Sequence, residues 1–362
     1  MGISNPQKGR GALSNPEGRF EGVKKERAED GWERARNPDE EEETLPVLET
    51  ILKPDPSRSI ISRNDSPDIP FSQSINPYKG CEHGCIYCYA RPSHEYLNLS
   101  PGLDFETKIF YKDRGPELLE QELRRPSYRP QAITLGANTD PYQPAERKLE
   151  VTRGILEVLN RFNHPASIIT KSTLVTRDID ILAEMARKNL IAVMVTITTL
   201  DNGLKRTLEP RAPAGSQRLK AIEALAKAGV PVGVMTAPII PVVNDAEMET
   251  ILEKAHGAGA QGAGYVLLRL PYQLKDLFRE WLAEHYPLKA EHVMSIINQS
   301  RGGKDYDSAF GTRMRGTGRF ADLIAQRFAL ATKRLDMQFN RRFRLETAHF
   351  KPPPEGGQLE LL

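Results

Sequence analysis

The sequence predicts an α/β protein whose parallel sheet closes part of a barrel. Six short segments rich in apolar and β-branched residues alternate with segments in which apolar residues recur at helical spacing. Polar and glycine-containing motifs follow several of these strands, at the edge where parallel sheets and barrels bind their ligands. A length of 362 residues is ample for one large domain of this kind with extensions at its ends.

The expected elements alternate from residue 71 to residue 335. Segment 191–198 is an almost continuous run of apolar and β-branched residues, which is typical of a strand buried on both faces. We expect barrel strands at residues 71–76, 131–136, 166–170, 191–198, 230–235 and 264–270, with a further extended segment at 105–112. We expect helices at residues 116–125, 146–162, 177–187, 216–228, 245–256, 274–285 and 319–335.

The chain divides into four expected parts. These are a disordered N-terminal arm at residues 1–58, the barrel at 59–288, a helical C-terminal extension that caps the barrel at 289–348, and a flexible tail at 349–362. The arm carries few large apolar residues and dense mixed charge. Such a segment cannot bury enough apolar surface to offset the entropy lost on ordering it.

Charge and hydrophobicity exclude several classes of protein. The 50 basic residues are balanced by 48 acidic ones, so net charge alone predicts no polyanionic partner. No apolar run reaches the roughly 18 residues that a transmembrane helix needs. Residues 1–20 are polar and lack the apolar core of a secretory signal. We therefore expect a cytoplasmic protein without membrane contact, in a reducing environment that keeps cysteines as thiols.

All three cysteines lie in one short stretch, Cys81-x3-Cys85-x2-Cys88, and Tyr87 immediately precedes the last of them. Three thiolates at this spacing can bind three irons of a [4Fe–4S] cluster, which usually takes four cysteines. Because the chain has no fourth cysteine, one iron would be open to a ligand that is not part of the protein. An open coordination position is typical of a reactive metal site.

Three other interpretations of these cysteines stay open. The spacing also fits one face of a buried helix, although Gly80 and Gly84 disfavour a regular helix there. A zinc site could take its fourth ligand from His83 or His94, but no second ligand pair follows at zinc-finger spacing. A disulfide is disfavoured by the odd number of cysteines and by the lack of an export signal.

The cysteine motif with its preceding tyrosine resembles the signature of the radical S-adenosylmethionine (radical SAM) superfamily. The longer string Asn76-Pro77-Tyr78-x-Gly80-Cys81-x-His83-x-Cys85-x-Tyr87-Cys88-Tyr89-Ala90 resembles its spore photoproduct lyase-related branch, whose members are DNA repair photolyase-like. The resemblance implies a partial (β/α)6 barrel, a [4Fe–4S] cluster and S-adenosyl-L-methionine at the open iron. It also implies an external electron donor of flavodoxin or ferredoxin type, and a 5′-deoxyadenosyl radical that takes hydrogen from a substrate.

The resemblance assigns cofactor contacts to the loop after the second barrel strand. Gly136 would allow close approach to the methionyl amine, and Asn138 and Asp140 offer acceptors. An Asx-turn before the following proline is an alternative that is compatible with this role. Tyr87 would either stack near the adenine, which the resemblance favours, or pack beneath the cysteine loop.

Further contacts are expected at the ends of the third and fourth strands. Lys171 would pair with the methionyl carboxylate, with Ser172 beside it, although a surface lysine is the alternative. Thr196 and Thr198 would suit the ribose, but alternating threonines are also ordinary strand residues. Arg218 is a second candidate for the carboxylate.

The sequence departs from spore photoproduct lyases in one respect. Those enzymes are thought to return a hydrogen atom from a cysteine away from the cluster, and this chain has no such cysteine. Either a tyrosine such as Tyr78, Tyr89 or Tyr142 takes that role, or the reaction differs. Photoproduct repair is therefore not transferred to this chain, and an auxiliary iron–sulfur cluster held by its thiolates is excluded.

The segment from Arg313 to Arg344 is strongly basic, with nine basic and two acidic residues and a local net charge of +7. Interleaved phenylalanines could stack on bases of a nucleic acid. Alternatively the phenylalanines cap the barrel and the arginines form a solvated face. The four phenylalanines of this segment are Phe320, Phe328, Phe339 and Phe343. The glycine-rich residues 311–318 could form a lid.

Two functions follow from the sequence as a whole. The protein is either a radical SAM enzyme acting on an unknown substrate, with nucleic acid as a candidate, or a non-catalytic zinc-stapled nucleic-acid-binding protein.

Overall fold

The computed structural model describes residues 9–20, 48–337 and 343–354. Its main sheet has seven strands in the order β10-β9-β8-β7-β6-β3-β2. The six strands from β3 to β10 in this row pair in parallel, and β2 (Ile61–Arg63) adds an antiparallel edge to β3. The predicted partial barrel of six parallel strands is therefore confirmed.

The six parallel strands lie where the apolar segments predicted them. Register runs from Ile75 opposite Leu135 at one end of the row to Tyr265 opposite Thr236 at the other. β8 is buried at all six positions, as the continuous apolar run indicates for a central strand. The strands are β3 (Gln73–Ile75), β6 (Ile133–Leu135), β7 (Ala166–Thr170), β8 (Ile191–Thr196), β9 (Val232–Ile239) and β10 (Gly262–Leu267).

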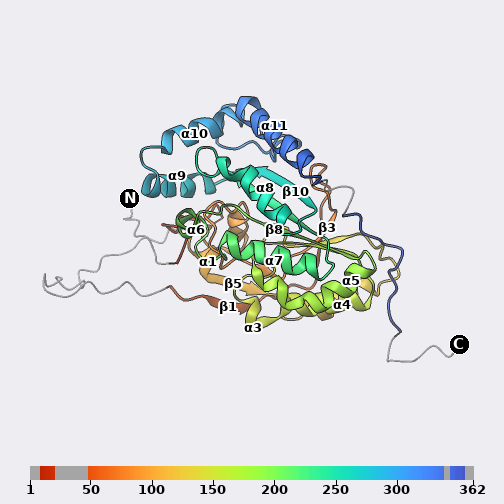
Figure 1. Cartoon of the computed structure of the whole chain (residues 1–362). Helices are drawn as coiled ribbons and strands as arrows, with labels where there is room; N and C mark the ends of the chain where they lie inside the picture. The colour runs from red at the N-terminus through yellow and green to blue at the C-terminus, as the bar shows by residue number, and fades with distance from the viewer. Residues whose placement is uncertain (1–8, 21–47, 338–342, 355–362) are drawn as a thin grey trace, which may run out of the picture.

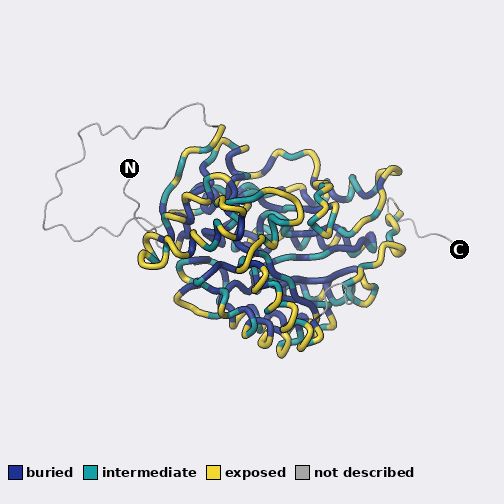
Figure 2. Tube along the Cα trace, turned by 90° about the horizontal axis from the view of Figure 1, so that it is seen from above, coloured by how far each residue is buried: buried dark blue, intermediate teal, exposed yellow. Residues whose placement is uncertain are grey.

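Helices follow the strands and cover the sheet (Figure 1). Their buried residues are mainly apolar, as amphipathic helices require. The expected single helix at 146–162 is two helices, because Glu150 adopts a left-handed φ of 52° between them. The helices between the strands are α2 (Gly115–Leu123), α3 (Glu146–Leu149), α4 (Val151–Arg161), α5 (Ile179–Arg187), α6 (Asn202–Leu208), α7 (Gly215–Lys227) and α8 (Met248–Gly257). Three 3-10 helices are η1 (Arg91–Leu97), η2 (Thr173–Asp178) and η3 (Asp245–Glu247). Figure 2 shows the buried residues mostly in the interior and the exposed ones at the periphery.

A second, three-stranded sheet in the order β1-β5-β4 lies beside the start of the barrel. It joins β1 (Ile51–Pro54), β5 (Lys108–Tyr111) and β4 (Tyr78–Lys79), and α1 (Asp104–Thr107) leads into β5. β4 runs directly into the first cysteine, and the Cys81 backbone amide donates to the Phe105 carbonyl at 2.9 Å. The segment expected to be extended at residues 105–112 is thus extended only in β5, because its first residues belong to α1, and it supports the cysteine loop.

The N-terminal segment (residues 9–20) departs from the disordered arm expected at 1–58. Ala12 is fully buried and Arg10 is 8% exposed, so this segment packs into the molecule. Residues 48–58 also join the fold, since they include β1. Sequence patterning missed this because the segment packs through backbone amides and glycine, without an apolar stripe. Residues 1–8 and 21–47 lie outside the described part of the chain.

The C-terminal extension covers the β10 edge of the sheet. It follows α9 (Leu274–His285) and comprises α10 (Ala290–Gln299), a loop, and α11 (Gly318–Arg334), which lie together along the top of Figure 1. The Leu267 amide donates to the Met314 carbonyl at 2.9 Å, and the ring centroids of Tyr265 and Phe328 lie 4.6 Å apart. The extension thus pairs with and packs on the last strand of the barrel.

The segment after α11 also departs from expectation where the structure describes it. The tail was expected to be flexible at 349–362, but the Lys351 amide donates to the Phe162 carbonyl at 3.0 Å. The ring centroid of Phe350 lies 5.6 Å from that of Tyr128 and 5.4 Å from that of His164. The Phe350 ring and backbone hydrogen bonds therefore fix residues that are polar and proline-rich in the sequence.

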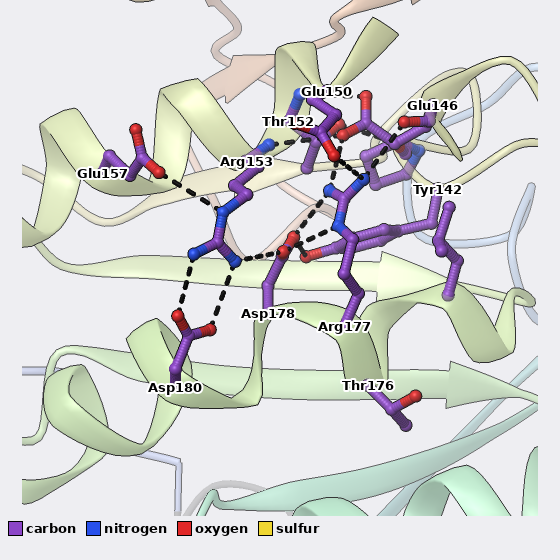
Figure 3. A network of polar contacts seen from close by, with 12 residues as sticks. Tyr142, Glu146, Glu150, Thr152, Arg153, Glu157, Thr176, Arg177, Asp178 and Asp180 are labelled. Atoms are coloured by element: carbon purple, nitrogen blue, oxygen red, sulfur yellow. Dashed lines mark hydrogen bonds and ion pairs between the residues drawn. The ribbon is translucent and has the colours of Figure 1, made fainter. Parts of the chain in front are cut away.

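An ion-pair network joins α3, α4, η2 and α5 on one side of the barrel (Figure 3). Arg177 pairs with buried Glu146 and Asp178 at 2.8 Å each. Arg153 pairs with Asp178 and Asp180, also at 2.8 Å each. Three further residues extend the network: the Tyr142 hydroxyl donates to Asp178 at 3.0 Å, the Thr152 amide donates to Glu146 at 3.0 Å, and Glu157 lies 3.3 Å from Arg153.

Across the described residues, no helix combines the length and apolar character that crossing a membrane requires.

Candidate functional site at the cysteine loop

The cysteine loop (residues 80–91) consists of consecutive tight turns. The Gly84 amide donates to the Cys81 carbonyl at 3.3 Å, and the Cys88 amide donates to the Cys85 carbonyl at 3.2 Å. Gly84 has a φ of +67°, a left-handed conformation that glycine adopts without strain. The chain is therefore not a straight helix here, and the three side chains belong to one wrapped loop.

The three thiols lie in the same corner of the molecule. Cys81 and Cys85 are buried, Cys88 is half-buried, and Cys88 packs against the apolar neighbours of both. Burial raises the pKa of Cys81 and raises the pKa of Cys85 to about 12. Thiols that are protonated in the apolar interior become thiolates when they bind a metal. The donor set fits three irons of one cluster.

Each residue between the first two cysteines has its own partner. The Glu82 carboxylate accepts from the Thr50 hydroxyl at 2.7 Å and lies 3.1 Å from Arg211. The His83 Nδ1 atom lies 3.4 Å from the Asp140 carboxylate. Glu82 and His83 thus each contact a residue outside the cysteine loop.

The segment that follows the second barrel strand supports the loop from one side. The Gln143 amide group donates to the Gly80 carbonyl at 3.1 Å, and its oxygen accepts from the Glu82 amide at 2.9 Å. The Thr139 hydroxyl donates to the Tyr78 carbonyl at 2.6 Å. Gln143 was not singled out in the sequence, because a glutamine after a proline-rich turn carries no pattern that distinguishes it.

Asp140 connects three pieces of the site. Its carboxylate accepts from the Tyr142 amide at 2.9 Å, which is the Asx-turn, and from the Thr170 hydroxyl at 2.6 Å and the Lys171 amide at 2.8 Å. Burial alone would raise the pKa of Asp140, but His83 and these donors outweigh it and hold the pKa well below its usual range. Asp140 therefore stays ionised and ties the second strand end to the third. A direct contact with the cofactor stays a prediction.

Tyr87 packs beneath the cysteine loop, whereas the resemblance favours stacking near the adenine, and its contact with the cofactor stays a prediction. Its hydroxyl donates to Glu209 at 2.5 Å and lies 3.0 Å from the Thr198 hydroxyl. Burial raises the pKa of Tyr87, so the phenol remains neutral. The Thr198 hydroxyl also reaches the Ala237 carbonyl at 3.1 Å. These contacts bring Thr198 to the loop through Tyr87.

Arg218 lies under the same residues and is completely buried. Its guanidinium pairs with Glu209 and donates to the carbonyls of Pro213 at 2.9 Å and Thr196 at 3.0 Å. Burial alone would raise the pKa of Glu209, but Arg218 outweighs it and lowers the pKa. Arg218 thus has a full set of protein partners, which leaves its predicted contact with the cofactor carboxylate without support.

Lys171 differs from these residues, because its charge has no carboxylate partner. Among the described residues no Asp or Glu lies within ion-pair distance of its Nζ atom, which sits 5.6 Å from the centre of the Tyr87 ring. Burial alone would lower the pKa of Lys171, but the negative groups around it outweigh this effect and raise the pKa. Lys171 is therefore a protonated ammonium at the end of β7, beside the cysteine loop.

The remaining predicted contacts have structural partners that the sequence did not indicate. A Cβ at Gly136 would meet the Ile169 carbonyl oxygen at 2.2 Å, so the neighbouring strand itself requires this glycine. The Asn138 backbone amide donates to the Asn76 side-chain oxygen at 2.9 Å. Ser172 caps η2, where it accepts from the Leu174 amide at 3.2 Å, and Thr196 is buried. All four lie at the strand ends, and their cofactor contacts stay predictions.

A mononuclear metal site finds no ligand set in this region. Across the described residues, no three His, Cys, Asp or Glu side chains are grouped to hold one ion. His83 faces Asp140, and His94 Nε2 contacts the Lys108 carbonyl at 2.9 Å. The zinc alternative therefore gains no support, since its four ligands must converge on one ion.

The basic C-terminal segment is partly neutralised where it is described, because three of its arginines form ion pairs. Arg313 pairs with Asp68, Arg327 with Glu249 at 2.6 Å, and Arg334 with Glu253. Phe320 and Phe328 pack on the barrel, as the capping alternative predicts. In the loop at 311–318, buried Arg301 donates to the carbonyls of Thr312 and Arg313. Phe339, Arg341 and Arg342 lie outside the described residues.

Comparison with protein families identifies the class. The model described as Radical SAM superfamily matches residues 75–255, half of the chain. The chain belongs to the radical SAM superfamily, whose members typically use a [4Fe–4S] cluster and S-adenosylmethionine, and membership implies an enzyme. The predicted family is thereby confirmed.

Related chains and solved structures agree with this assignment. An uncharacterized protein of Mycobacterium tuberculosis (strain ATCC 25618 / H37Rv) is 39% identical over 289 residues, 79% of each chain. An uncharacterized protein of Methanocaldococcus jannaschii is 31% identical over 173 residues, 48% of this chain and 62% of its own. Spore photoproduct lyase complexed with dinucleoside spore photoproduct matches with a TM-score of 0.55 at 13% identity, covering 78% of each chain. That likeness shows a shared fold.

Proposed function

We propose that this protein is a radical SAM enzyme in which Cys81, Cys85 and Cys88 bind a [4Fe–4S] cluster with one iron open to S-adenosyl-L-methionine. When bound, the cluster and its ligand would supply reductive cleavage of the sulfonium C–S bond of S-adenosylmethionine. The products would be methionine and a 5′-deoxyadenosyl radical, which abstracts hydrogen from a substrate. An external electron donor of flavodoxin or ferredoxin type would reduce the cluster. The observation that carries the proposal is that the loop with three thiols lies beside the Lys171 ammonium. Among the described residues, no carboxylate lies within ion-pair distance of this ammonium.

The protein's own groups would bind and orient rather than react. Lys171 offers a positive charge to a carboxylate, at the carboxyl end of a parallel strand where barrels bind ligands. Asp140 holds the Lys171 backbone against the second strand end, and the Tyr87–Glu209–Arg218 contacts fix the floor beneath the loop. A rigid, largely dry surround of this kind limits side reactions of a reactive intermediate.

Nucleic acid is the substrate class that we favour. Tyr89 directly follows Cys88, is 44% exposed, and carries the Arg269 guanidinium 5.0 Å from its ring centre. No Asp or Glu of the described residues pairs with Arg269, which contacts the Tyr306 hydroxyl at 3.2 Å. An arginine between two tyrosines can receive a phosphate while the rings stack on bases. Photoproduct repair itself is not proposed, because the chain has three cysteines in all.

Anaerobic reconstitution tests the function directly. We expect a brown, oxygen-labile chromophore and formation of 5′-deoxyadenosine under dithionite, and colourless stoichiometric zinc would instead support the non-catalytic alternative. Changing Cys81, Cys85 or Cys88 to Ala should abolish both chromophore and cleavage, since each thiolate binds a different iron. Any one of these variants that still cleaves S-adenosylmethionine would contradict the assignment. Deuterium transfer from labelled oligonucleotides into 5′-deoxyadenosine would identify the substrate.

A further inference from the structure

The N-terminal segment reaches the back of the cysteine loop from about seventy residues away in sequence. The Gly11 and Ala12 amides donate to the two oxygens of the Glu106 carboxylate, at 3.0 and 2.9 Å. Glu106 is fully buried and also pairs with fully buried Arg91. A buried carboxylate that receives two amides and a guanidinium has its charge well compensated.

Backbone contact between the N-terminal segment and the loop is very close. A Cβ built on Gly11 would lie 1.8 Å from the Gly84 carbonyl oxygen and 3.4 Å from the Ile86 amide nitrogen. A Cβ on Gly84 would in turn lie 2.7 Å from the Glu106 carboxylate. Ala12 belongs to the same apolar cluster as Cys85 and Ile86. Residues 11 and 12 therefore pack against the cysteine loop where Gly84 and Ile86 flank Cys85.

Two further contacts fix the loop to the N-terminal segment. Arg91 Nε donates to the Cys85 carbonyl at 2.9 Å, so the guanidinium that pairs with Glu106 also holds a cysteine of the loop. On the other side, Arg10 donates to the Glu106 carbonyl at 2.9 Å and to the Thr50 hydroxyl at 3.3 Å. That hydroxyl donates to Glu82, which precedes the loop's second turn. Both turns of the loop are thereby tied to Arg10, Gly11 and Ala12.

We propose that residues 10–12 are a positioning segment of the cluster site, which docks on Glu106 to close the loop behind Cys85 and to shield it from solvent and oxygen. The inference rests on the proposed function for the cluster itself, but the docking and the shielding of Cys85 do not need iron. A loop whose thiols must approach three irons at once gains from being held in advance, since less conformational entropy is lost when the cluster binds. A closed wall also keeps small oxidants from the sulfur.

The substitution Gly11→Ala tests the proposal, because its Cβ cannot coexist with the Gly84 carbonyl oxygen. Gly9→Ala on the same segment is the matched control: a Cβ there meets nothing within 4 Å, and its φ of +78° adds strain at that residue alone. Iron-free protein is treated with iodoacetamide, and alkylation of each cysteine is followed by peptide mass analysis. We expect Cys85 to react about tenfold faster or more in Gly11→Ala, a change equivalent to about 1.4 kcal/mol of lost docking. Gly9→Ala should stay within about twofold of the native protein.

Reconstituted protein provides the second readout. The cluster of Gly11→Ala should bleach faster in air than that of the native protein or of Gly9→Ala, with unchanged iron content at the start. Equal Cys85 alkylation and equal bleaching in all three proteins would overturn the proposal. Hydrogen exchange of the native chain is independent of any variant: the Gly11 and Ala12 amides should be protected, and unprotected amides there would also overturn it. If native protein binds no cluster, the proposed function fails, while alkylation and exchange still decide the docking.

Discussion

Lys171 and Arg218 show how two basic residues near one site can have different roles. The resemblance makes both of them candidates to bind the methionyl carboxylate of S-adenosylmethionine. Arg218 is completely buried and pairs with Glu209, whereas Lys171 has no carboxylate within ion-pair distance in the described residues. Removing Arg218 would leave Glu209 as an uncompensated buried charge, so Arg218 serves the fold. The Lys171 ammonium forms no ion pair within the described residues, which is what the proposed contact with a carboxylate requires.

Replacing Lys171 by Ala should weaken S-adenosylmethionine binding by about 1.5–3 kcal/mol, the range for a hydrogen bond to a charged group. The ultraviolet–visible spectrum of the cluster should not change, because Lys171 contacts no cysteine ligand through a hydrogen bond. Equilibrium binding on the reconstituted protein measures the effect. Lys220→Ala, on the exposed face of α7, is the control and should bind like the native protein. An unaltered dissociation constant for Lys171→Ala would return this residue to the role of an ordinary lysine.

More of the site residues than of their hydrogen-bond partners could be predicted from the sequence. The cysteines, Asp140 and Lys171 could be selected because their types and positions after strands carry chemical meaning. Gln143 and Glu106 could not, since their importance lies in which backbone amides and carbonyls the fold brings to them. Gly136 was selected for a ligand, but the neighbouring strand already explains it. Long-range backbone partners leave no local pattern in a sequence.

At the scale of elements, α11 combines two kinds of arginine. Arg327 pairs with Glu249 of α8 at 2.6 Å, and Arg334 pairs with Glu253. Arg319 at the start of the helix and Arg315 just before it are exposed and have no ion pair with any described residue. The charge of this segment in the sequence therefore overstates the charge that is free to meet a phosphate.

Binding to nucleic acid, which stays a prediction, should follow this division. If the segment contacts phosphates of duplex DNA, replacing Arg315 and Arg319 by Gln should flatten the log–log salt dependence by up to about 0.9 for each lost contact. Replacing Arg327 and Arg334 by Gln should leave the slope unchanged, because their charges are already paired. Fluorescence anisotropy across a salt series measures both. A native protein without salt-dependent affinity for single- or double-stranded nucleic acid would contradict this prediction.

Helices and strands with strong periodicity were predictable, and short elements were not. β7 and α9 match their expected bounds, because each has a clear apolar pattern between polar turns. α10 was missed although it is half apolar, since it lies beside a long glycine-rich loop. The two-residue strand β4 has no periodicity at all and exists because β5 pairs with it. Such elements depend on tertiary contacts rather than on local preference.

At the scale of the whole molecule, burial of two histidines, His94 and His164, makes the stability of the protein depend on pH in acid. Burial lowers the pKa of both His94 and His164 to about 4, against about 6.5 in an unfolded chain. Between these values the unfolded chain binds more protons than the folded one. The free energy of unfolding therefore rises with pH from about pH 4 to about 6.5, and this stabilisation is lost as the pH falls through the same window.

Replacing His164 by Gln should reduce that pH dependence by at most about 1.4 kcal/mol per pH unit, the contribution of one proton. Urea unfolding at several pH values between 4.5 and 7 gives the slope. His256→Gln, at an exposed position of α8, is the matched control and should keep the native slope. Equal slopes for the native protein and His164→Gln would show that His164 titrates normally in the fold.

The ion-pair network around Arg153 and Arg177 has a consequence in terms of heat. Dehydrating charged groups costs less free energy as temperature rises, so linked ion pairs contribute relatively more to a warm protein than to a cold one. This network links four helical elements and, through the Tyr142 hydroxyl, the turn that carries Asp140 and Gln143. By contrast, the ion pairs between α11 and α8 involve two partly exposed arginines. On warming, the elements beside the cysteine loop should therefore stay folded to a higher temperature than the C-terminal extension. Hydrogen exchange followed with temperature would record the extension opening first.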